Sequence, residues 1–437
     1  MKVAFYTLGC KVNQYETDLM IEQFKENKFE IVDFKEKADV YVINSCSVTN
    51  LSTRKSRQAI SKAKNLNKKA IVILVGCYTE ELNFTENKFK LYDLALGNEE
   101  KKEIVKHVNE YIKTNFKANE SKLVVKKDIN NVKRYIQKVT VASIKEIRQT
   151  IKIEDGCNNF CSYCIIPYTR GRVRSRNLDE IIKEIKNLAS KGVKEIVLVG
   201  IEIVSYGIDL ENNISLIDVI EEINKIDGIE RIRLGSLEPR WLTDETIERL
   251  TKVDKLCNHF HISTQSLNNA VLKRMNRKYT KEYILDLTAK LKNKFNNISI
   301  TTDLIVGYIN ETEEEFKDTC SMVSKIGFND IHVFKFSKRE HTRAYDMETT
   351  VTPEMSNLRS KELIKFGSDL KNEYLHNMLN KKYKILVEEC KEGYIYGYTS
   401  NYIKVKTKGD EKLWGKIVEV ELIEIEKGKD LILAKLV

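Results

Sequence analysis

The sequence predicts an α/β protein with an N-terminal doubly wound parallel sheet, a central partial (β/α)6 barrel and a small C-terminal antiparallel β-barrel. Apolar strand-like runs alternate twice with amphipathic segments, which is typical of parallel βαβ units. Short alternating runs separated by turns follow, and they indicate the C-terminal barrel. We expect the parts to span 1–112, a linker at 113–147, the central barrel with its trailing helix at 148–379, and the C-terminal barrel at 380–437.

The first part contains short apolar runs rich in β-branched residues, as buried parallel strands require. The predicted strands are Lys2–Leu8, Val40–Asn44, Ala70–Val75 and Leu94–Leu96. The predicted helices between and after them are Gln14–Lys25, Ser52–Asn65 and Glu100–Ile112. The basic, weakly periodic stretch 113–148 predicts a linker that leads into the next strand.

The central part repeats the alternation with longer connections. Six strands are predicted, at Arg148–Glu154, Glu195–Gly200, Arg231–Ser236, His259–Thr264, Ser299–Val306 and Ile331–Phe336. The clearest helix follows Asn177, a suitable N-cap with Glu180 three residues on. Six βα units predict a partial barrel, whose active site lies at the carboxyl ends of the strands.

The C-terminal part begins after a predicted helix at Pro353–Leu379. Five short alternating segments follow, at Lys384–Glu388, Tyr394–Tyr398, Tyr402–Lys406, Ile417–Ile423 and Asp430–Val437. Their length and turn spacing predict a small closed antiparallel barrel.

Composition favours a cytoplasmic protein. Nine cysteines without a signal peptide argue against a disulfide-stapled secreted protein. No apolar run approaches the ~18 residues needed to span a membrane, so no membrane partner is expected. The formal net charge of +10 favours a polyanionic partner, although lysines also cover ordinary solvated helix faces.

Three cysteines, Cys157, Cys161 and Cys164, follow the first strand of the central part with the spacing C-x3-C-x2-C. Three close thiolates suit an iron–sulfur cluster, and three ligands on a four-iron cube leave one iron open to a substrate. The alternatives are a zinc site and unrelated cysteines. A zinc site would need a fourth His or Cys nearby, and none lies between Lys145 and Lys255.

Cys10, Cys46 and Cys77 each lie at or just beyond the carboxyl end of a predicted parallel strand. Such ends border the crevice where doubly wound sheets bind ligands, so the three thiols could hold a second cluster. The alternative is three buried cysteines that act as small apolar side chains. Gly9 and Gly76 favour a site, because glycine permits tight turns and a close approach of the backbone.

These motifs resemble the radical S-adenosylmethionine (SAM) methylthiotransferases over essentially the whole chain. Gly9-Cys10 through Glu16, Asn44 through Thr49, and Val75-Gly76-Cys77 resemble their N-terminal domain. Asp155-Gly156-Cys157 through Arg176 resembles their radical SAM signature, and the C-terminal barrel resembles their tRNA-binding TRAM domain. The residues after Cys10 are similar to the branch that acts on tRNA threonylcarbamoyladenosine (t6A).

The resemblance implies conversion of the C2–H of t6A at tRNA position 37 to a methylthio group. It assigns a SAM-cleaving [4Fe–4S] cluster to Cys157, Cys161 and Cys164, and a second, auxiliary [4Fe–4S] cluster to Cys10, Cys46 and Cys77. Two SAM molecules are used per turnover, one as radical source and one as methyl donor. The implied partners are tRNA carrying t6A37 and an electron donor such as flavodoxin or ferredoxin, and we expect a monomer.

The resemblance also implies a SAM-binding set. Its members lie in the cysteine loop and at the ends of the second, fourth and fifth central strands: Tyr163, Gly200, Glu202, Ser263, Gln265 and Asp303. No catalytic side chain beyond the cluster ligands is expected, since the C2–H is not acidic enough for a side-chain base.

Two basic segments are candidate RNA contacts. Arg170, Arg172, Arg174 and Arg176 recur at every second position, and an extended segment would place them on one face, available to phosphate or cofactor. On the C-terminal barrel, Lys404, Lys406 and Lys408 alternate after Tyr402, beside Tyr396 and Tyr398. Basic groups interleaved with aromatics suit RNA, although tyrosine-rich strands are also ordinary barrel material.

Four segments depart from the pattern of the family. The usual Gly-aromatic-Pro-Gly-Glu-Thr turn reads Gly307-Tyr308-Ile309-Asn310-Glu311-Thr312, Leu267 replaces a glycine, Lys335 replaces a proline, and Gly200-Ile201-Glu202 lacks the usual Gly-x-Asn. All border the expected SAM or substrate cavity. Alternatives are therefore the same chemistry on isopentenyladenosine tRNA or on a ribosomal protein, and a non-catalytic iron–sulfur RNA-binding protein.

Overall fold

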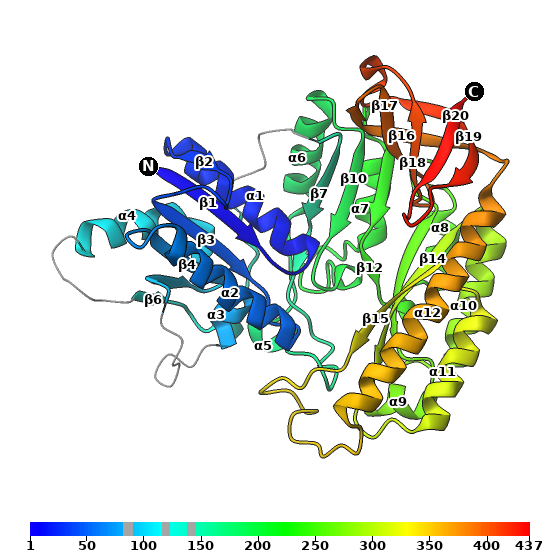
Figure 1. The fold of residues 1–437 in the computed structure, drawn as a ribbon, viewed down its shortest axis with the longest axis horizontal. Helices are drawn as coiled ribbons and strands as arrows, with labels where there is room; N and C mark the ends of the chain where they lie inside the picture. The colour runs from blue at the N-terminus through cyan, green and yellow to red at the C-terminus, as the bar shows by residue number, and fades with distance from the viewer. Residues whose placement is uncertain (82–90, 116–122, 138–145) are drawn as a thin grey trace. The chain divides into compact units, whose positions relative to one another are not determined.

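The computed structural model describes residues 1–81, 91–115, 123–137 and 146–437 (Figure 1). The chain forms two compact units. The first comprises Met1–Ser143, Lys152–Asn177 and Ser337–Tyr345, and the second comprises Ile144–Ile151, Leu178–Phe336 and Asp346–Val437. The linker predicted at 113–147 falls partly outside the described residues, at 116–122 and 138–145.

The first unit is built on a six-stranded parallel sheet with the order β2-β1-β3-β4-β5-β6. The strands are β1 (Lys2–Thr7), β2 (Glu30–Val32), β3 (Val40–Ser45), β4 (Ile71–Gly76), β5 (Leu94–Leu96) and β6 (Leu123–Val125). The helices are α1 (Lys11–Glu26), α2 (Asn50–Leu66), α3 (Cys77–Glu81) and α4 (Ile104–Asn115). Strands β2 and β6 and helix α3 were not predicted; β2 and β6 are short, partly exposed edge strands, unlike the fully buried β5.

Two apolar clusters cover the two faces of this sheet. Ile43 packs with Ala59 and Ile60 of α2, whereas its neighbour Val42 packs with Met20 of α1 and Val108 of α4. Adjacent residues of β3 therefore face opposite helix layers, as the parallel strands of a doubly wound sheet do. The predicted doubly wound domain is confirmed.

The second unit contains a parallel half-barrel formed by two sheets, β11-β10-β7 and β12-β13-β14-β15. The strands are β7 (Arg148–Lys152), β10 (Glu195–Val199), β11 (Arg231–Leu234), β12 (Ser236–Leu237), β13 (His259–Gln265), β14 (Ser299–Val306) and β15 (Asp330–Lys335). The helices are α6 (Leu178–Ser190), α7 (Leu216–Asn224), α8 (Asp244–Leu250), α9 (Asn269–Arg274), α10 (Lys281–Lys294), α11 (Glu313–Ile326) and α12 (Pro353–Met378). Helix α6 begins directly after Asn177, as predicted, and the partial barrel is confirmed.

The C-terminal strands close into the barrel β16-β17-β18-β20-β19 (Figure 1). They are β16 (Lys382–Lys391), β17 (Tyr394–Thr399), β18 (Lys404–Lys408), β19 (Ile417–Ile425) and β20 (Ile432–Leu436). The barrel differs from the predicted antiparallel one at a single pair, because β18 and β20 run parallel. Leu375 and Met378 of α12 join its core. Among the described helices, none is both long and apolar enough to cross a membrane.

Candidate functional site

Cys10, Cys46 and Cys77 meet at the carboxyl edge of the parallel sheet of the first unit. Cys10 caps the start of α1, while Cys46 and Cys77 directly follow β3 and β4. A Cβ atom added to Gly9 would lie 3.1 Å from the Cys46 sulfur. Burial and the neighbouring Cys77 and Cys10 thiols raise the pKa of Cys46 to about 11. The strand ends thus gather the three thiols as the sequence predicted.

Glycine is required beside two of these cysteines. Gly9 and Gly76 have φ values of 99° and 93°, which L side chains rarely adopt. A Cβ at Gly9 would also lie 2.9 Å from the Cys46 Cβ, and one at Gly76 would collide with the Ser45 carbonyl. The backbone at both glycines thus packs closely against its neighbours, as the sequence predicted for tight turns.

Two asparagines fix the loops that present Cys10 and Cys46. The Asn13 side-chain amide donates to the carbonyls of Leu8, at 2.7 Å, and of Ser45, at 3.0 Å. The Asn44 amide donates in turn to the Asn13 carbonyl at 2.8 Å. Asn44 Oδ1 and Thr79 Oγ1 are buried without a hydrogen-bond partner in the part of the chain that the structure describes.

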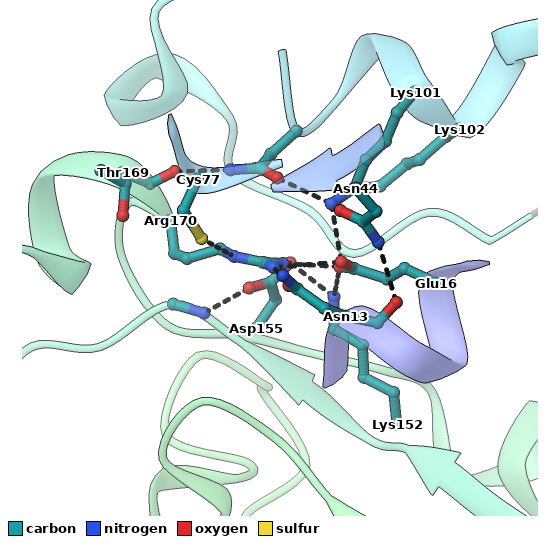
Figure 2. A network of polar contacts seen from close by, with 12 residues as sticks. Asn13, Glu16, Asn44, Cys77, Lys101, Lys102, Lys152, Asp155, Thr169 and Arg170 are labelled. Atoms are coloured by element: carbon teal, nitrogen blue, oxygen red, sulfur yellow. Dashed lines mark hydrogen bonds and ion pairs between the residues drawn. The ribbon is translucent and has the colours of Figure 1, made fainter. Parts of the chain in front are cut away.

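A buried network of charges adjoins Cys77 (Figure 2). The fully buried guanidinium of Arg170 donates from Nε to the Cys77 sulfur at 3.2 Å. Its other nitrogens donate to Glu16, at 2.5 and 3.0 Å, and to Asn13 Oδ1 at 2.6 Å. Every guanidinium nitrogen of Arg170 therefore has an acceptor, and one of the acceptors is a cysteine sulfur.

Two lysines complete this network. Lys101 Nζ lies 2.6 Å from Glu16, and Lys152 Nζ lies 2.7 Å from Glu16 and 2.6 Å from Asp155. Burial disfavours the charged form of Glu16, but Arg170, Lys101 and Lys152 hold its pKa well below the ordinary value. In the same way, Lys152, Arg170 and Arg174 outweigh burial and lower the pKa of Asp155.

The network contains more positive than negative charge. The buried members Arg170, Arg174, Lys101 and Lys152 supply four cations, whereas the buried Glu16 and Asp155 supply two carboxylates, and the half-buried Glu99 lies 3.6 Å from Arg174. Buried charges need compensation, and an anionic Cys77 sulfur in contact with Arg170 would provide a further negative charge. This arrangement suits a thiolate that ligates a metal, and it does not suit an apolar buried cysteine.

The second cysteine set lies in a loop of the same unit, between β8 (Glu154–Asp155) and β9 (Arg174–Ser175). The Cys157 amide donates to the Gly171 carbonyl at 3.0 Å, and the Cys164 amide donates to the Cys161 carbonyl at 2.9 Å. The Cys157 sulfur accepts from the Asn159 amide at 3.4 Å. The loop is thus tightly turned and offers three soft donors, which fits an iron–sulfur cluster.

The segment Ser337–Tyr345 contacts both cysteine loops within the first unit. Arg339 donates to the Ser47 carbonyl, to Asn50 Oδ1 at 2.6 Å and to Thr53 Oγ1 at 2.9 Å. The Ala344 amide donates to the Ser162 carbonyl at 2.8 Å. This role was missed from the sequence; the available signal was the position of the segment after a barrel strand, where functional loops lie.

The expected SAM-binding residues fall in separate places. Tyr163 lies in the cysteine loop, whereas the others belong to the second unit. Gly200 follows β10, and Glu202 precedes a short 3-10 helix. Ser263 and Gln265 lie on an irregular part of β13 whose carbonyls accept from Arg277 and Tyr279. Both carboxylate oxygens of Asp303, on β14, already face histidines.

Asn310 compensates one departure from the family pattern. It stands where the pattern has its second glycine, and its φ is 52°. Asparagine tolerates this left-handed conformation better than other side chains, so the turn is kept. The adjacent Glu311 accepts from the Gly307 amide at 2.7 Å and pairs with Arg359 at 3.0 Å. Leu267, by contrast, fills a fully buried position.

The predicted shared face of four arginines is wrong. Arg170, Arg174 and Arg176 are buried, and only Arg172 is exposed, where its guanidinium lies 4.4 Å from the Phe160 ring centroid. Alternation places side chains on one face but does not say whether that face meets solvent. The side chains of Arg170 and Arg174 are therefore not accessible to RNA.

The structure places the lysines and tyrosines of the C-terminal barrel side by side on neighbouring strands, and their contact with RNA stays a prediction. Lys404 and Lys406 pair across strands with Tyr398 and Tyr396, and Lys406 Nζ lies 4.5 Å from the Tyr394 ring centroid. Tyr402 is placed differently. It stacks on Tyr398 at 5.0 Å between ring centroids and lies 4.4 Å from the Arg233 guanidinium. Tyr402 therefore belongs to the contact between this barrel and the half-barrel, both within the second unit.

Fold and motif comparisons agree on the class of protein. The Radical SAM superfamily model matches residues 151–323, and the model described as Uncharacterized protein family UPF0004 matches residues 2–97. The fold is similar to the radical S-adenosylmethionine methyltransferase TsrM from Kitasatospora setae, with a TM-score of 0.58 and 13% identity over 79% of this chain and 77% of that chain. The fold and the cysteine motif thus define a radical SAM protein.

Curated relatives narrow the family. The chain is 39% identical to the threonylcarbamoyladenosine tRNA methylthiotransferase MtaB of Bacillus subtilis, over 97% of this chain and 94% of the relative. It is 37% identical to the Aquifex aeolicus protein of the same name, over 96% of this chain and 100% of the relative. It is 34% identical to the tRNA-2-methylthio-N(6)-dimethylallyladenosine synthase of Alkaliphilus oremlandii, over 97% of this chain and 90% of the relative. The chain belongs to the family of radical SAM tRNA methylthiotransferases, and this membership implies a [4Fe–4S] cluster and SAM.

Proposed function

We propose that this enzyme converts t6A to 2-methylthio-t6A at position 37 of tRNA. The proposal rests mainly on the presence of both cysteine sets in one compact unit. Arg170 connects them, because it contacts Cys77 of the first set and lies only six residues beyond Cys164 of the second set. The names of the relatives at 39% and 37% identity support t6A as the modified nucleoside.

We assign the two cysteine sets to two [4Fe–4S] clusters. Cys157, Cys161 and Cys164 would hold the SAM-cleaving cluster, and Cys10, Cys46 and Cys77 the auxiliary cluster. When bound, the clusters and two SAM molecules supply three things: the radical that removes the C2 hydrogen, the sulfur that replaces this hydrogen, and the methyl group on that sulfur. The excess positive charge beside Cys77 and the unpartnered Thr79 hydroxyl, which can donate a hydrogen bond, fit an anionic group at the auxiliary site.

The chain itself would hold and orient these groups. Arg170 would donate to the Cys77 thiolate, and hydrogen bonds to cluster sulfurs are one means by which proteins set cluster potentials. Arg339 and Ala344 would fix the two cysteine loops relative to each other within the first unit. Tyr163, Gly200, Glu202, Ser263 and Gln265 remain the proposed SAM contacts.

We propose that tRNA binds the C-terminal barrel through Lys404, Lys406 and Lys408, with Tyr394 and Tyr396 beside them. Lysines that track phosphate, next to aromatic rings that stack on bases, suit single-stranded loops. Arg172 is a further candidate contact. We also infer that the protein is a cytoplasmic monomer and that it receives electrons from a flavodoxin or ferredoxin. We place its domains at 1–112, 148–379 and 380–437.

A second candidate substrate is dimethylallyladenosine, the isopentenyladenosine of the sequence analysis, because relatives at 31% to 34% identity carry synthase names for it. The test supplies the anaerobically reconstituted enzyme with SAM, reductant and an equal mixture of both tRNAs, followed by mass spectrometry of the nucleosides. Methylthio-t6A as the main product supports the proposal, and methylthio-dimethylallyladenosine would overturn it. Absence of 5′-deoxyadenosine from fully loaded protein would favour a non-catalytic RNA-binding protein.

A further inference from the structure

His261, Asp303 and His332 form a compact polar cluster on the half-barrel of the second unit. They come from the neighbouring parallel strands β13, β14 and β15, and Asp303 pairs in register with His332. One ligand atom from each side chain lies within 4.8 Å of the other two. Neither cysteine set contributes to this cluster, so it is separate from the cluster sites proposed above.

The cluster lies on the face of the sheet opposite the covering helices. Phe260 packs its ring on Phe295 at the end of α10, and a Cβ on Gly367 of α12 would collide with Ile331. Successive strand residues point to opposite faces, so His261 and His332 point away from these helices. Asp303 shares their face, because it contacts both imidazoles.

The spacing of the ligand atoms matches a coordination shell. His261 Nε2 lies 3.1 Å from Asp303 Oδ2, and His332 Nδ1 lies 3.3 Å from Asp303 Oδ1. Two atoms held about 2.1 Å from one ion are about 3.0 to 3.4 Å apart at octahedral or tetrahedral angles. The side chains therefore need little movement to converge on a single ion.

The outer contacts suit metal-ligating histidines. His261 Nδ1 lies 2.8 Å from Thr301 Oγ1, which is the type of partner that fixes the tautomer and ring orientation of such a histidine. If Nδ1 donates to Thr301, Nε2 presents its lone pair toward the Asp303 carboxylate. Two facing lone-pair groups repel each other unless a cation lies between them. His332 is 53% exposed, which leaves coordination positions open to water or substrate.

We propose that His261, Asp303 and His332 form a binding site for one divalent transition-metal ion on the inner face of the half-barrel. Two imidazoles and one carboxylate are a donor set for Mn²⁺, Fe²⁺ or Zn²⁺. The ion would occupy the Asp303 oxygens, so it and the SAM contact expected of Asp303 exclude each other.

Electron paramagnetic resonance of Mn²⁺ tests this site in the full-length protein, reconstituted with iron and sulfide so that the cluster cysteines are occupied. The titration is done without SAM or tRNA, so its result is independent of the proposed function. The site predicts one Mn²⁺ per chain, displaced by Zn²⁺. Asp303→Asn and His332→Ala should each weaken binding at least about tenfold, and Thr301→Val by about tenfold through the outer contact.

His376→Ala is the matched control, because His376 is exposed on α12 and its Nδ1 lies 2.7 Å from the Asn372 carbonyl oxygen. The affinity of this variant for Mn²⁺ should be unchanged. Circular dichroism checks the fold of each variant, and the exposed His332 carries the test if Asp303→Asn does not fold. Less than one Mn²⁺ per chain, or equal affinity in His332→Ala and the parent, would mean adventitious binding or a plain ion-pair cluster and would overturn the proposal.

Discussion

Each unit of the protein buries a cluster of arginines next to a cysteine, and the two clusters differ in what the arginines contact. In the first unit, Arg170 donates from Nε directly to the Cys77 sulfur. In the second unit, Arg233 donates from Nε to Glu195 at 2.7 Å and from its other nitrogens to the Ser400 and Thr399 carbonyls. Burial raises the pKa of the neighbouring Cys257 to about 11.

The two arginine clusters therefore have different roles: the first adjoins a candidate metal site, and the second, the anchor, joins the C-terminal barrel to the half-barrel. Arg231 also donates to backbone carbonyls of the C-terminal barrel, those of Tyr398 and Lys384. The arginines of the second unit therefore fasten that barrel to the half-barrel and need no thiolate. Arg170, Lys101 and Lys152 donate instead to side chains, and the buried cations there outnumber the buried carboxylates. Burial of a cysteine beside an arginine is thus not enough to indicate a metal ligand. The features that favour Cys77 as a ligand are its direct hydrogen bond from Arg170 and the excess of buried positive charge around it.

The largest effect is expected from removing a proposed cluster ligand. Cys161→Ala should lose about four irons per chain and all cleavage of SAM to 5′-deoxyadenosine, because one of three ligands is gone. Iron analysis and chromatography of 5′-deoxyadenosine measure this. Cys257→Ala is the control and should keep both iron and cleavage. Retained cleavage in Cys161→Ala would refute the assignment.

Paired arginine variants sharpen the comparison. Arg170→Gln and Arg233→Gln each break a buried ion pair, at a cost of about 3 kcal/mol in the free energy of unfolding. Only Arg170→Gln should lower the reduction potential of the auxiliary cluster, since it removes a hydrogen bond to a ligating sulfur. A redox titration followed by paramagnetic resonance measures the potential. Equal potentials in both variants would make the Arg170 contact purely structural.

The anchor of the second unit predicts a pH effect. Burial raises the pKa of Glu388 to about 7 from its ordinary 4.5, although Arg148 opposes the shift. Well below pH 4.5 the Glu388 carboxyl is protonated in both the folded and the unfolded state, so its titration does not change the free energy of unfolding there. As pH rises to about 7, the unfolded chain loses this proton first and stability falls. Glu388→Gln should therefore raise the free energy of unfolding at pH 8 by up to about 3 kcal/mol.

Tryptophan fluorescence during urea unfolding measures this effect, because both tryptophans, Trp241 and Trp414, belong to the second unit. The gain should disappear at pH 4.5. A gain of the same size at both pH values would show that burial of an amide, and not titration of Glu388, is responsible.

The smallest effect is expected on the RNA face. The double substitution of Lys404 and Lys406 by Ala should weaken tRNA binding and reduce its salt slope by about 2, one for each lost phosphate contact. Filter binding over a range of salt concentrations measures both. Lys225→Ala, an exposed lysine beside Glu222 and outside the C-terminal barrel, is the control. Deleting the whole barrel is a poorer test, because it would strip Arg231 and Arg233 of their acceptors.

Local pattern was sufficient for the strands and for the ends where the cysteines lie. The predicted strand Ser299–Val306 coincides with β14, because it is a mostly buried run rich in β-branched residues between two amphipathic segments. Long-range pairing was not readable in this way. Glu16 meets Lys101 and Lys152, which are 85 and 136 residues away, and nothing in their own sequence neighbourhoods marks them. The helix predicted at Gln14–Lys25 includes Glu16 but leaves out Asn13, which lies in the first turn of α1.

The central claim is that the Cys77 set serves sulfur transfer while the Cys157 set serves SAM cleavage. The most direct test is the ratio of methylthio-t6A to 5′-deoxyadenosine formed by Cys77→Ala and by the parent enzyme on t6A-containing tRNA. The account predicts 5′-deoxyadenosine without methylthio-t6A in the variant. Methylthio-t6A formed at the parent ratio would contradict it and would make Cys77 a structural cysteine like Cys257.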